Sequence, residues 1–407
     1  MQFFKTNNQL SDSPGLRSLA VVIPAMLLIF LSCDKGTEPT ISGDTFVITN
    51  CTLIDGTGNA PVTHAAIVIS KGLIVAVGSA DSTTIPQNAR VVNVNGATVL
   101  PGFINAHVHS GFNRENLRAW AQSGVTTVRD LAGPSSFAWK KEVSKDPYCA
   151  LLVAAGPMIS VPNGYPFVPW GSPYMLPVSS PEEAQTEAAQ LLDAGADIIK
   201  LSMESGASFQ RIIPSLTPEQ ASAAVNAAHQ HGTIASAHVL VTSDLARAVE
   251  AGVDNIAHMV TDYLPDSLIH VMLDDSVLWT PTLELWHHVG SSLREAAINN
   301  LRKYVLAGGL IALGTDFDGY DAPFQLGMPI HEMEWMLQAG MPPMQVIVAG
   351  TRNAALACNR LSDLGTLETG KIADVLVVDG DPLADLHTLA NVRLVIHRGV
   401  IIRDPES

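Results

Sequence analysis

Eight short apolar segments alternate with longer stretches of helical character, and this alternation constrains the fold more than any other feature of the chain. Each segment is five to eight residues long, and most are rich in the branched apolar residues of buried parallel strands. The segments are residues 102–109, 125–131, 151–156, 197–201, 233–239, 254–260, 278–283 and 310–316. Strands separated by helices form parallel sheets. Eight such units in about 250 residues predict the α/β class and a (β/α)8 TIM barrel.

Capping residues mark the expected helix boundaries between these strands. Residues 180–183 (SPEE) and 217–220 (TPEQ) each place Ser or Thr before Pro, with Glu or Gln at the third helical position. This pattern predicts two capping boxes with Pro at the first helical position. We expect Gly195 to end the first of these helices. A further helix is predicted to begin at Ser243-Asp244.

The chain is β-rich on both sides of this central region. Residues 46–100 alternate short β-branched runs with turns, and the last forty residues contain the strand-like runs IADVLVVDG and VRLVIHRGVII. Two β-rich ends around a different middle predict one accessory sheet domain to which both ends contribute. The expected boundaries are residues 45–99 and 365–407 for the accessory domain and 100–364 for the barrel.

The start of the chain has the composition of an export signal. Residues 19–31 (LAVVIPAMLLIFL) carry no charge, and Lys5 and Arg17 precede them. A basic segment followed by a short apolar run is typical of a signal peptide. The run is shorter than the ~20 apolar residues that span a bilayer.

A cysteine follows this apolar run. The Ser32-Cys33 pair resembles the end of a bacterial lipoprotein signal, in which the Cys becomes a lipidated N-terminus, although Phe30 stands where Leu is usual. We therefore expect residues 1–32 to be a signal peptide and residues 33–44 a tether. A lipid on Cys33 is then the expected membrane attachment, at the periplasmic or outer face of the cell envelope. An uncleaved N-terminal anchor helix is the alternative.

Charge and cysteine content narrow the class of partner. The formal net charge is −16 at pH 7, which repels phosphate backbones and argues against a nucleic-acid partner. A small-molecule substrate is the expected partner, and a homo-oligomer is left open. The four cysteines are widely spaced and do not form a disulfide framework. The 47% hydrophobic content is enough for the domain to be held together by its core.

Side chains that bind metals stand at the ends of several predicted strands. His107 and His109 are two residues apart on the first strand, so both can point to the same side. The other members of this set are Lys200, His238, His258 and Asp316, near the ends of the fourth, fifth, sixth and eighth strands. The C-terminal ends of barrel strands meet at one mouth. Because imidazole and carboxylate are standard ligands of zinc and its neighbours, the sequence predicts a metal site there.

Lys200 is the unusual member of this set, because an ammonium group beside two divalent ions is electrostatically untenable. Its amine could be neutral, or it could swing out to bind a substrate carboxylate. A third alternative is reaction with carbon dioxide, which gives an anionic carbamate whose two oxygens can bridge two metals.

The motifs resemble those of the amidohydrolase superfamily. They include TLIDGTG, LPGFINAHVH, LGTD and the closing LGTLETGKIADVLVVDGDPL, and the resemblance extends from Phe46 to Arg403. It implies a (β/α)8 barrel with a small composite β-sandwich and two divalent metal ions, with zinc expected. It also implies that His107, His109 and Asp316 hold one metal, that His238 and His258 hold the other, and that carboxylated Lys200 bridges them. The imidazolonepropionase-like and Xaa-Pro dipeptidase-like branch looks nearest, and Lys200 favours its dipeptidase side.

This site predicts hydrolysis of an amide bond, of the dipeptide or N-acyl amino acid type. A metal-bridging hydroxide would attack the carbonyl, and Asp316 would carry the proton to the leaving group. A lactone, an ester or a cyclic amide remains the alternative substrate, and a binding protein without catalysis is a third hypothesis. Candidate substrate-binding residues are His287, His288, Tyr165 and Asp318. Tyr165 lies in a Pro- and Gly-rich segment, 156–181, whose length without expected secondary structure is typical of a binding loop or lid.

Overall fold

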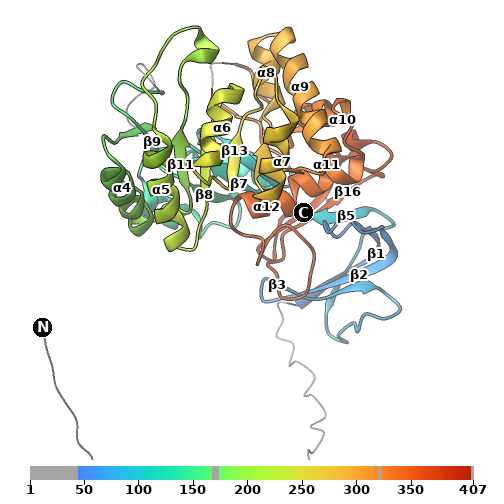
Figure 1. Cartoon of the computed structure of the whole chain (residues 1–407). Helices are drawn as coiled ribbons and strands as arrows, with labels where there is room; N and C mark the ends of the chain where they lie inside the picture. Colours follow the sequence, from blue (N-terminus) through green and yellow to red (C-terminus); the bar gives the residue numbers. More distant parts are fainter. Residues whose placement is uncertain (1–44, 167–173, 320–321, 405–407) are drawn as a thin grey trace, which may run out of the picture. The chain divides into compact units, whose positions relative to one another are not determined.

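The computed structural model describes residues 45–166, 174–319 and 322–404 (Figure 1). The predicted signal peptide and tether, with Cys33, lie outside the described residues. Within the described ranges, no helix is both long and apolar enough to cross a membrane. The described strands form one mixed sheet of eight strands and two parallel sheets of seven and three strands.

Strands from both ends of the described chain share the eight-stranded sheet, whose order is β18-β17-β16-β5-β1-β2-β3, with β4 paired to β1. The two ends meet where β5 runs antiparallel to β16, with Val99 opposite Val377. Buried Val, Ile and Leu side chains from both ends form the core of this sheet. The strands are β1 (Thr45–Leu53), β2 (Val62–Ser70), β3 (Leu73–Ser79), β4 (Arg90–Asn93), β5 (Thr98–Pro101), β16 (Val375–Val378), β17 (Val392–His397) and β18 (Val400–Arg403). The β-sandwich form of this domain stays a prediction.

All strands of the middle region are parallel to their neighbours. The three-stranded sheet contains β6 (Phe103–Val108), β7 (Val125–Asp130) and β8 (Leu151–Ala154). The seven-stranded sheet contains β9 (Met158–Ser160), β10 (Met175–Pro177), β11 (Ile199–Ser202), β12 (Ala235–His238), β13 (Asn255–Ala257), β14 (Leu278–Thr280) and β15 (Leu310–Ile311). Each of the eight predicted segments overlaps one of these strands, and the α/β class with parallel strands of the TIM-barrel type is confirmed.

Hydrogen bonds connect the two parallel sheets on both sides. On one side, Ala106 N donates to Leu313 O (2.8 Å), and Val108 bridges to Phe317 in parallel. On the other side, Asp197 N, just before β11, donates to Ala154 O of β8 (2.8 Å).

The helices alternate with the parallel strands and follow β15 (Figure 1). They are α1 (Arg114–Gln122), α2 (Phe137–Val143), α4 (Pro181–Ala194), α5 (Pro218–Gln230), α6 (Thr242–Glu250), α7 (Asp266–Asp274), α8 (Leu283–Val289), α9 (Ser291–Leu306), α10 (Ile330–Gln338), α11 (Pro343–Gly350) and α12 (Arg352–Ala357). Two short 3-10 helices, η1 (Ala207–Phe209) and η2 (Leu386–Ala390), complete the set.

Local capping chemistry explains where several of these helices begin. Thr217 and Gln220 form the predicted capping box of α5. Ser180 caps α4 as expected, but the Glu183 carboxylate accepts from Ser179 N (2.6 Å), one residue before the cap. The helix predicted from Ser243-Asp244 is α6, which begins one residue earlier, at Thr242. The Asp244 carboxylate does not cap it and accepts instead from Ser205 N and Oγ, both at 2.9 Å.

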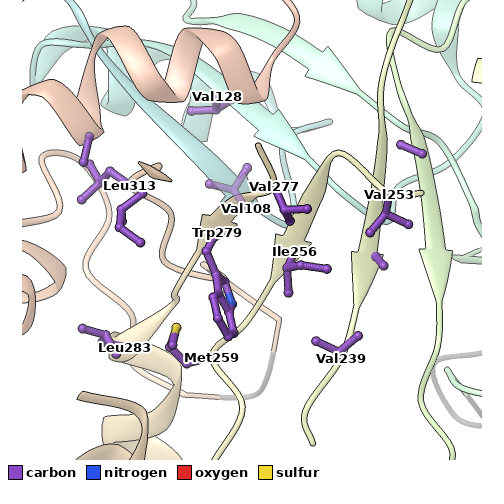
Figure 2. Packing of buried hydrophobic residues seen from close by; sticks show 14 of the residues in the cluster. Val108, Val128, Val239, Val253, Ile256, Met259, Val277, Trp279, Leu283 and Leu313 are labelled. Carbon is purple, nitrogen blue, oxygen red and sulfur yellow. The ribbon is translucent and has the colours of Figure 1, made fainter. Parts of the chain in front are cut away.

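Two structural features refine the rest of the middle region. The segment 156–181 was expected to lack secondary structure, but it contains β9 and β10, which pair in parallel. A large hydrophobic core lies between the strands and helices, and Figure 2 shows Trp279 of β14 beside Ile256, Met259 and Leu283. Trp279 is fully buried, and its Nε1 donates to the carbonyl of His258 (2.6 Å). The core therefore fixes the backbone of a predicted metal ligand.

Candidate metal centre

Asp316 lies against both histidines of the HVH motif. Its Oδ1 is 3.1 Å from His107 Nε2 and 3.0 Å from His109 Nε2. His107 lies within β6, and His109 follows the end of that strand. Backbone hydrogen bonds set this geometry, since Asp316 N donates to His107 O (2.9 Å) and His109 N donates to Phe317 O (2.7 Å).

The segment that carries Asp316 is tied to β6 by a buried amide. Asn105 Nδ2 donates to Thr315 Oγ1 (3.0 Å), and Thr315 N donates to Asn105 Oδ1 (3.2 Å). Asp316 itself has a left-handed backbone, with φ of +64°. Non-glycine residues rarely adopt this region, and such strained residues cluster at functional sites. This strained conformation places the carboxylate against His107 and His109.

His258 follows β13 and completes a compact group with His107 and Asp316. Each of the three buried residues offers one ligand atom, and these atoms lie within 4.8 Å of one another. The Nδ1 atom of His258 is 2.9 Å from Thr282 Oγ1, so Nε2 is the ring nitrogen left for a ligand. A hydrogen bond at one ring nitrogen that orients the other is the usual arrangement around metal-binding histidines.

Lys200 is buried on β11, with only 1% of its surface exposed. Its Nζ has no hydrogen-bond partner among the described residues. Burial, followed by the positive charge of Arg129, holds the pKa of this amine well below its ordinary value. The fold therefore favours a neutral amine, which is the nucleophilic form.

His238 ends β12 and lies beside His258, with ring centroids 4.7 Å apart. The ring of Tyr165 stacks on His238 at 4.4 Å with an interplanar angle of 18°. Burial lowers the pKa of His107, His238 and His258 well below the ordinary value of histidine. Neutral imidazole is the form that binds metals. For His109, burial also lowers the pKa, but the hydrogen bond to Asp316 raises it more, so the net shift is upward.

These side chains open onto a cavity of about 260 Å³. Its lining includes all six predicted metal ligands. Tyr165 and Asp318, two of the predicted substrate-binding residues, also line it, together with Ser110, Met158 and Tyr174. The donor set is imidazole, carboxylate and an amine, with buried atoms on Lys200 and His238 that lack hydrogen-bond partners among the described residues. Such a set fits divalent ions of the zinc type.

The other two predicted substrate-binding residues lie elsewhere. His287 and His288 belong to α8 and are not among the residues that line the cavity. His287 Nδ1 pairs with Arg294 (2.9 Å), and its ring stacks on Trp335. His288 packs edge-on against Phe324. Their role in substrate binding stays a prediction that this placement does not support.

The sequence analysis did not single out three buried residues that lie beside the predicted ligands. Asn105, Thr282 and Glu204 are all buried next to predicted ligands or the segments that carry them. Asn105 and Glu204 could have been found from the sequence. Asn105 stands two residues before His107, and Glu204 stands four residues after Lys200, so in an extended chain each lies on the same side as that predicted ligand. Thr282 carried none, since only the fold brings it to His258.

A family model described as the amidohydrolase family matches residues 98–402. The chain belongs to the amidohydrolase family. This amidohydrolase is a hydrolase that acts on carbon–nitrogen bonds of small molecules, and the resemblance seen in the sequence motifs is confirmed at the level of the superfamily.

Individual relatives agree with this assignment. The amidohydrolase is 25% identical to the ochratoxinase of Aspergillus niger over 413 residues, which is 85% of this chain and 83% of the relative. It is 25% identical to the imidazolonepropionase of Geobacillus sp. (strain WCH70) over 365 residues, 78% of this chain and 84% of the relative. A solved Xaa-Pro dipeptidase with bound methionine in its active site is similar with a TM-score of 0.74 and 25% identity, covering 88% of this chain and 99% of that one.

Proposed function

We propose that this amidohydrolase uses two divalent metal ions to hydrolyse amide bonds of dipeptides or N-acyl amino acids. The observation that carries the proposal is the buried group of His107, His258 and Asp316, whose ligand atoms lie within 4.8 Å of one another beside the unpartnered amine of Lys200. The similarity of the chain to a Xaa-Pro dipeptidase and to an ochratoxinase supports a substrate with an amide bond.

The residues divide between the two ions as follows. His107, His109 and Asp316 would hold one ion, His238 and His258 the other, and a carboxylated Lys200 would bridge them. The neutral, buried amine of Lys200 supports carboxylation, because only an unprotonated amine reacts with carbon dioxide. Ions held in this way supply Lewis-acid activation of water and of the substrate carbonyl.

The protein contributes orientation, a proton acceptor and a shielded cavity. Asp316 is held over His107 and His109 by backbone hydrogen bonds, so its carboxylate can take a proton from the attacking water and deliver it to the leaving nitrogen. Thr282 holds the ring of His258. Tyr165 covers His238 and limits the access of bulk water to the site.

A substrate panel with metal analysis tests this proposal. The purified protein should contain close to two divalent ions per chain and should hydrolyse dipeptides or N-acyl amino acids faster than lactones, esters or cyclic amides. Fewer than one ion per chain after reconstitution would contradict the metal site. Faster turnover of a lactone, an ester or a cyclic amide would keep the site and replace the substrate class.

The finer architecture belongs to the same proposal. We propose that the two parallel sheets form one closed (β/α)8 barrel and that the strands of both chain ends form a β-sandwich. The hydrogen bonds that link the parallel sheets on both sides support closure. A crystal structure in which β8 lacks contact with the β11 segment, or β6 lacks contact with the β15 segment, would contradict it.

We also propose export and a lipid anchor at Cys33, supported by the sequence of residues 1–33. Incorporation of a labelled fatty acid in the native bacterial host tests this directly. The wild-type protein should be labelled and should fractionate with membranes, whereas Cys33→Ala should not be labelled. A Cys51→Ala variant, with a buried thiol removed, serves as the matched control and should retain the label. Oligomeric state can be measured on the same material by light scattering.

A further inference from the structure

Glu204 is a buried carboxylate next to the proposed metal centre that none of the assignments above includes. It follows β11 and is fully buried, and the alternation of the chain places Lys200, Ser202 and Glu204 in one row. Its Oε2 is 3.8 Å from His238 Nε2. Neither of these two atoms has a hydrogen-bond partner among the described residues.

The other oxygen of this carboxylate is firmly anchored. Oε1 accepts from Gly206 N (2.7 Å) and from Ser208 Oγ (3.0 Å). The anchoring loop needs glycine at position 206, because φ is +88° and a Cβ there would lie 2.3 Å from Arg211 O. The loop therefore fixes one oxygen of Glu204 and leaves the other directed at His238.

The separation of 3.8 Å is an ion-pair distance and exceeds a hydrogen bond. Two buried polar atoms that face each other unpaired are costly, and hydrogen bonds in metal-free or substrate-free sites often shorten when the site is assembled. The two rings next to His238 limit how it can respond, since Tyr165 stacks on one face and His258 packs edge-on. A small movement of His238 within its plane would close the gap to Glu204.

We propose that Glu204 is a positioning residue that accepts the Nε2 proton of His238 and so presents Nδ1 of that histidine to the metal. This inference rests on the proposed function, because it assigns a role toward the same metal centre. A carboxylate that accepts from one ring nitrogen fixes the tautomer of the imidazole and raises its basicity as a ligand. In His258, by contrast, Thr282 contacts Nδ1 and leaves Nε2 for the metal. The two histidines proposed for this ion would therefore bind it through different ring nitrogens.

Glu204→Gln is a sharp test, because its oxygen can keep the contacts to Gly206 and Ser208 while its NH2 group faces His238. The amide NH2 of the new Gln side chain would donate to Nε2 of His238. The ring proton of His238 would then move to Nδ1, where it would block metal binding. We expect affinity for zinc at one of the two sites to fall by about 10- to 100-fold, as for other residues that orient metal-binding histidines. Zinc affinity measured by competition with a chelator, without any substrate, is the readout.

The matched control is Asp244→Asn. Asp244, on α6, is equally buried, but its hydrogen-bond partners among the described residues are Ser205 and Arg247 and include no histidine. It should retain wild-type zinc affinity. Activity lost in Glu204→Gln should return when zinc is raised above the weakened dissociation constant, which a merely unfolded variant would not show.

A crystal structure of the zinc-loaded wild-type protein decides the question even if Glu204→Gln fails to fold. Zinc about 2.0–2.1 Å from Nδ1 of His238, with Glu204 Oε2 within hydrogen-bond distance of Nε2, would support the inference. Zinc bound to Nε2, or a Glu204→Gln variant with unchanged zinc affinity, would overturn it. Wild-type protein that binds no zinc would instead overturn the proposed function.

Discussion

His107 Nε2 lies 3.1 Å from Oδ1 of Asp316, although the first residue belongs to β6 and the second follows β15. The contact therefore joins the first and the last parallel strands of the middle region. Backbone hydrogen bonds between the same two segments hold it in place. The site can form only when these distant parts of the chain are paired.

Replacing Asp316 by Asn should lower kcat by about 10²- to 10⁴-fold, because the variant loses both a metal ligand and the group proposed to move the proton. Steady-state kinetics and metal analysis of the same sample measure this. Asp379→Asn, which removes a half-exposed carboxylate of the terminal sheet region, should stay within about twofold of wild type. Full activity in Asp316→Asn would contradict the proposed role.

Lys200 should carry carbon dioxide as a carbamate when metal is bound. Protein reconstituted with zinc and ¹³C-bicarbonate should show a labelled carbonyl signal by NMR, and Lys200→Met should lack it. Lys140→Met is the control, because Lys140 pairs with Asp197 at 2.6 Å and is not among the residues that line the cavity, so its removal should leave the signal unchanged. Metal loading that does not respond to bicarbonate would refute the carbamate.

The sequence was sufficient to locate the strands and the candidate ligands that line the cavity, but not their supporting contacts. The strands could be predicted because runs such as residues 151–156 are short and apolar. Asp316 could be predicted because strand ends converge. The start of α6 could not, because Asp244 caps a helix in isolation but binds Ser205 in the folded protein. The same holds for Thr282, whose contact to His258 depends on a turn with a left-handed residue.

The buried pair of Asp374 and His397 should make stability depend on pH. Burial raises the pKa of Asp374, but the charge and hydrogen bond of His397 and the Arg398 N–H lower it more, so the net pKa lies below the ordinary value of 3.8. The carboxylate accepts from Arg398 N (2.7 Å) and His397 Nδ1 (2.9 Å). The stabilisation is therefore fully present above the unfolded pKa and is lost as the pH falls through the lower folded value.

Asp374→Asn should accordingly reduce the free energy of unfolding by about 1–3 kcal/mol at neutral pH. The difference from wild type should persist at pH 5 and shrink below a pH of about 4. Urea unfolding at several pH values measures it. A stability difference between wild type and Asp374→Asn that grows as the pH falls would contradict the lowered pKa of Asp374.

The three described cysteines should be inert in the native protein. All are buried and unpaired, and burial raises the pKa of the Cys51 and Cys358 thiols to about 11. At pH 8 about one such thiol in a thousand is ionised, so a thiolate-directed reagent should not react before unfolding. After denaturation three thiols should react in protein whose Cys33 carries a lipid, and four where Cys33 is unmodified. Rapid labelling of the native enzyme would contradict this burial.

The pairing of β5 with β16 has a consequence for synthesis of the enzyme. Residues 98–101 leave the ribosome long before residues 375–378, their partners in the terminal sheet. Until then one edge of β5 has no strand to pair with, and the nascent chain exposes it. Because this pairing joins residues 98–101 to residues 375–378, folding is expected to be slow and to finish only after translation of the last strands. The terminal sheet is therefore expected to be completed last, after the parallel strands between its two halves have been synthesised.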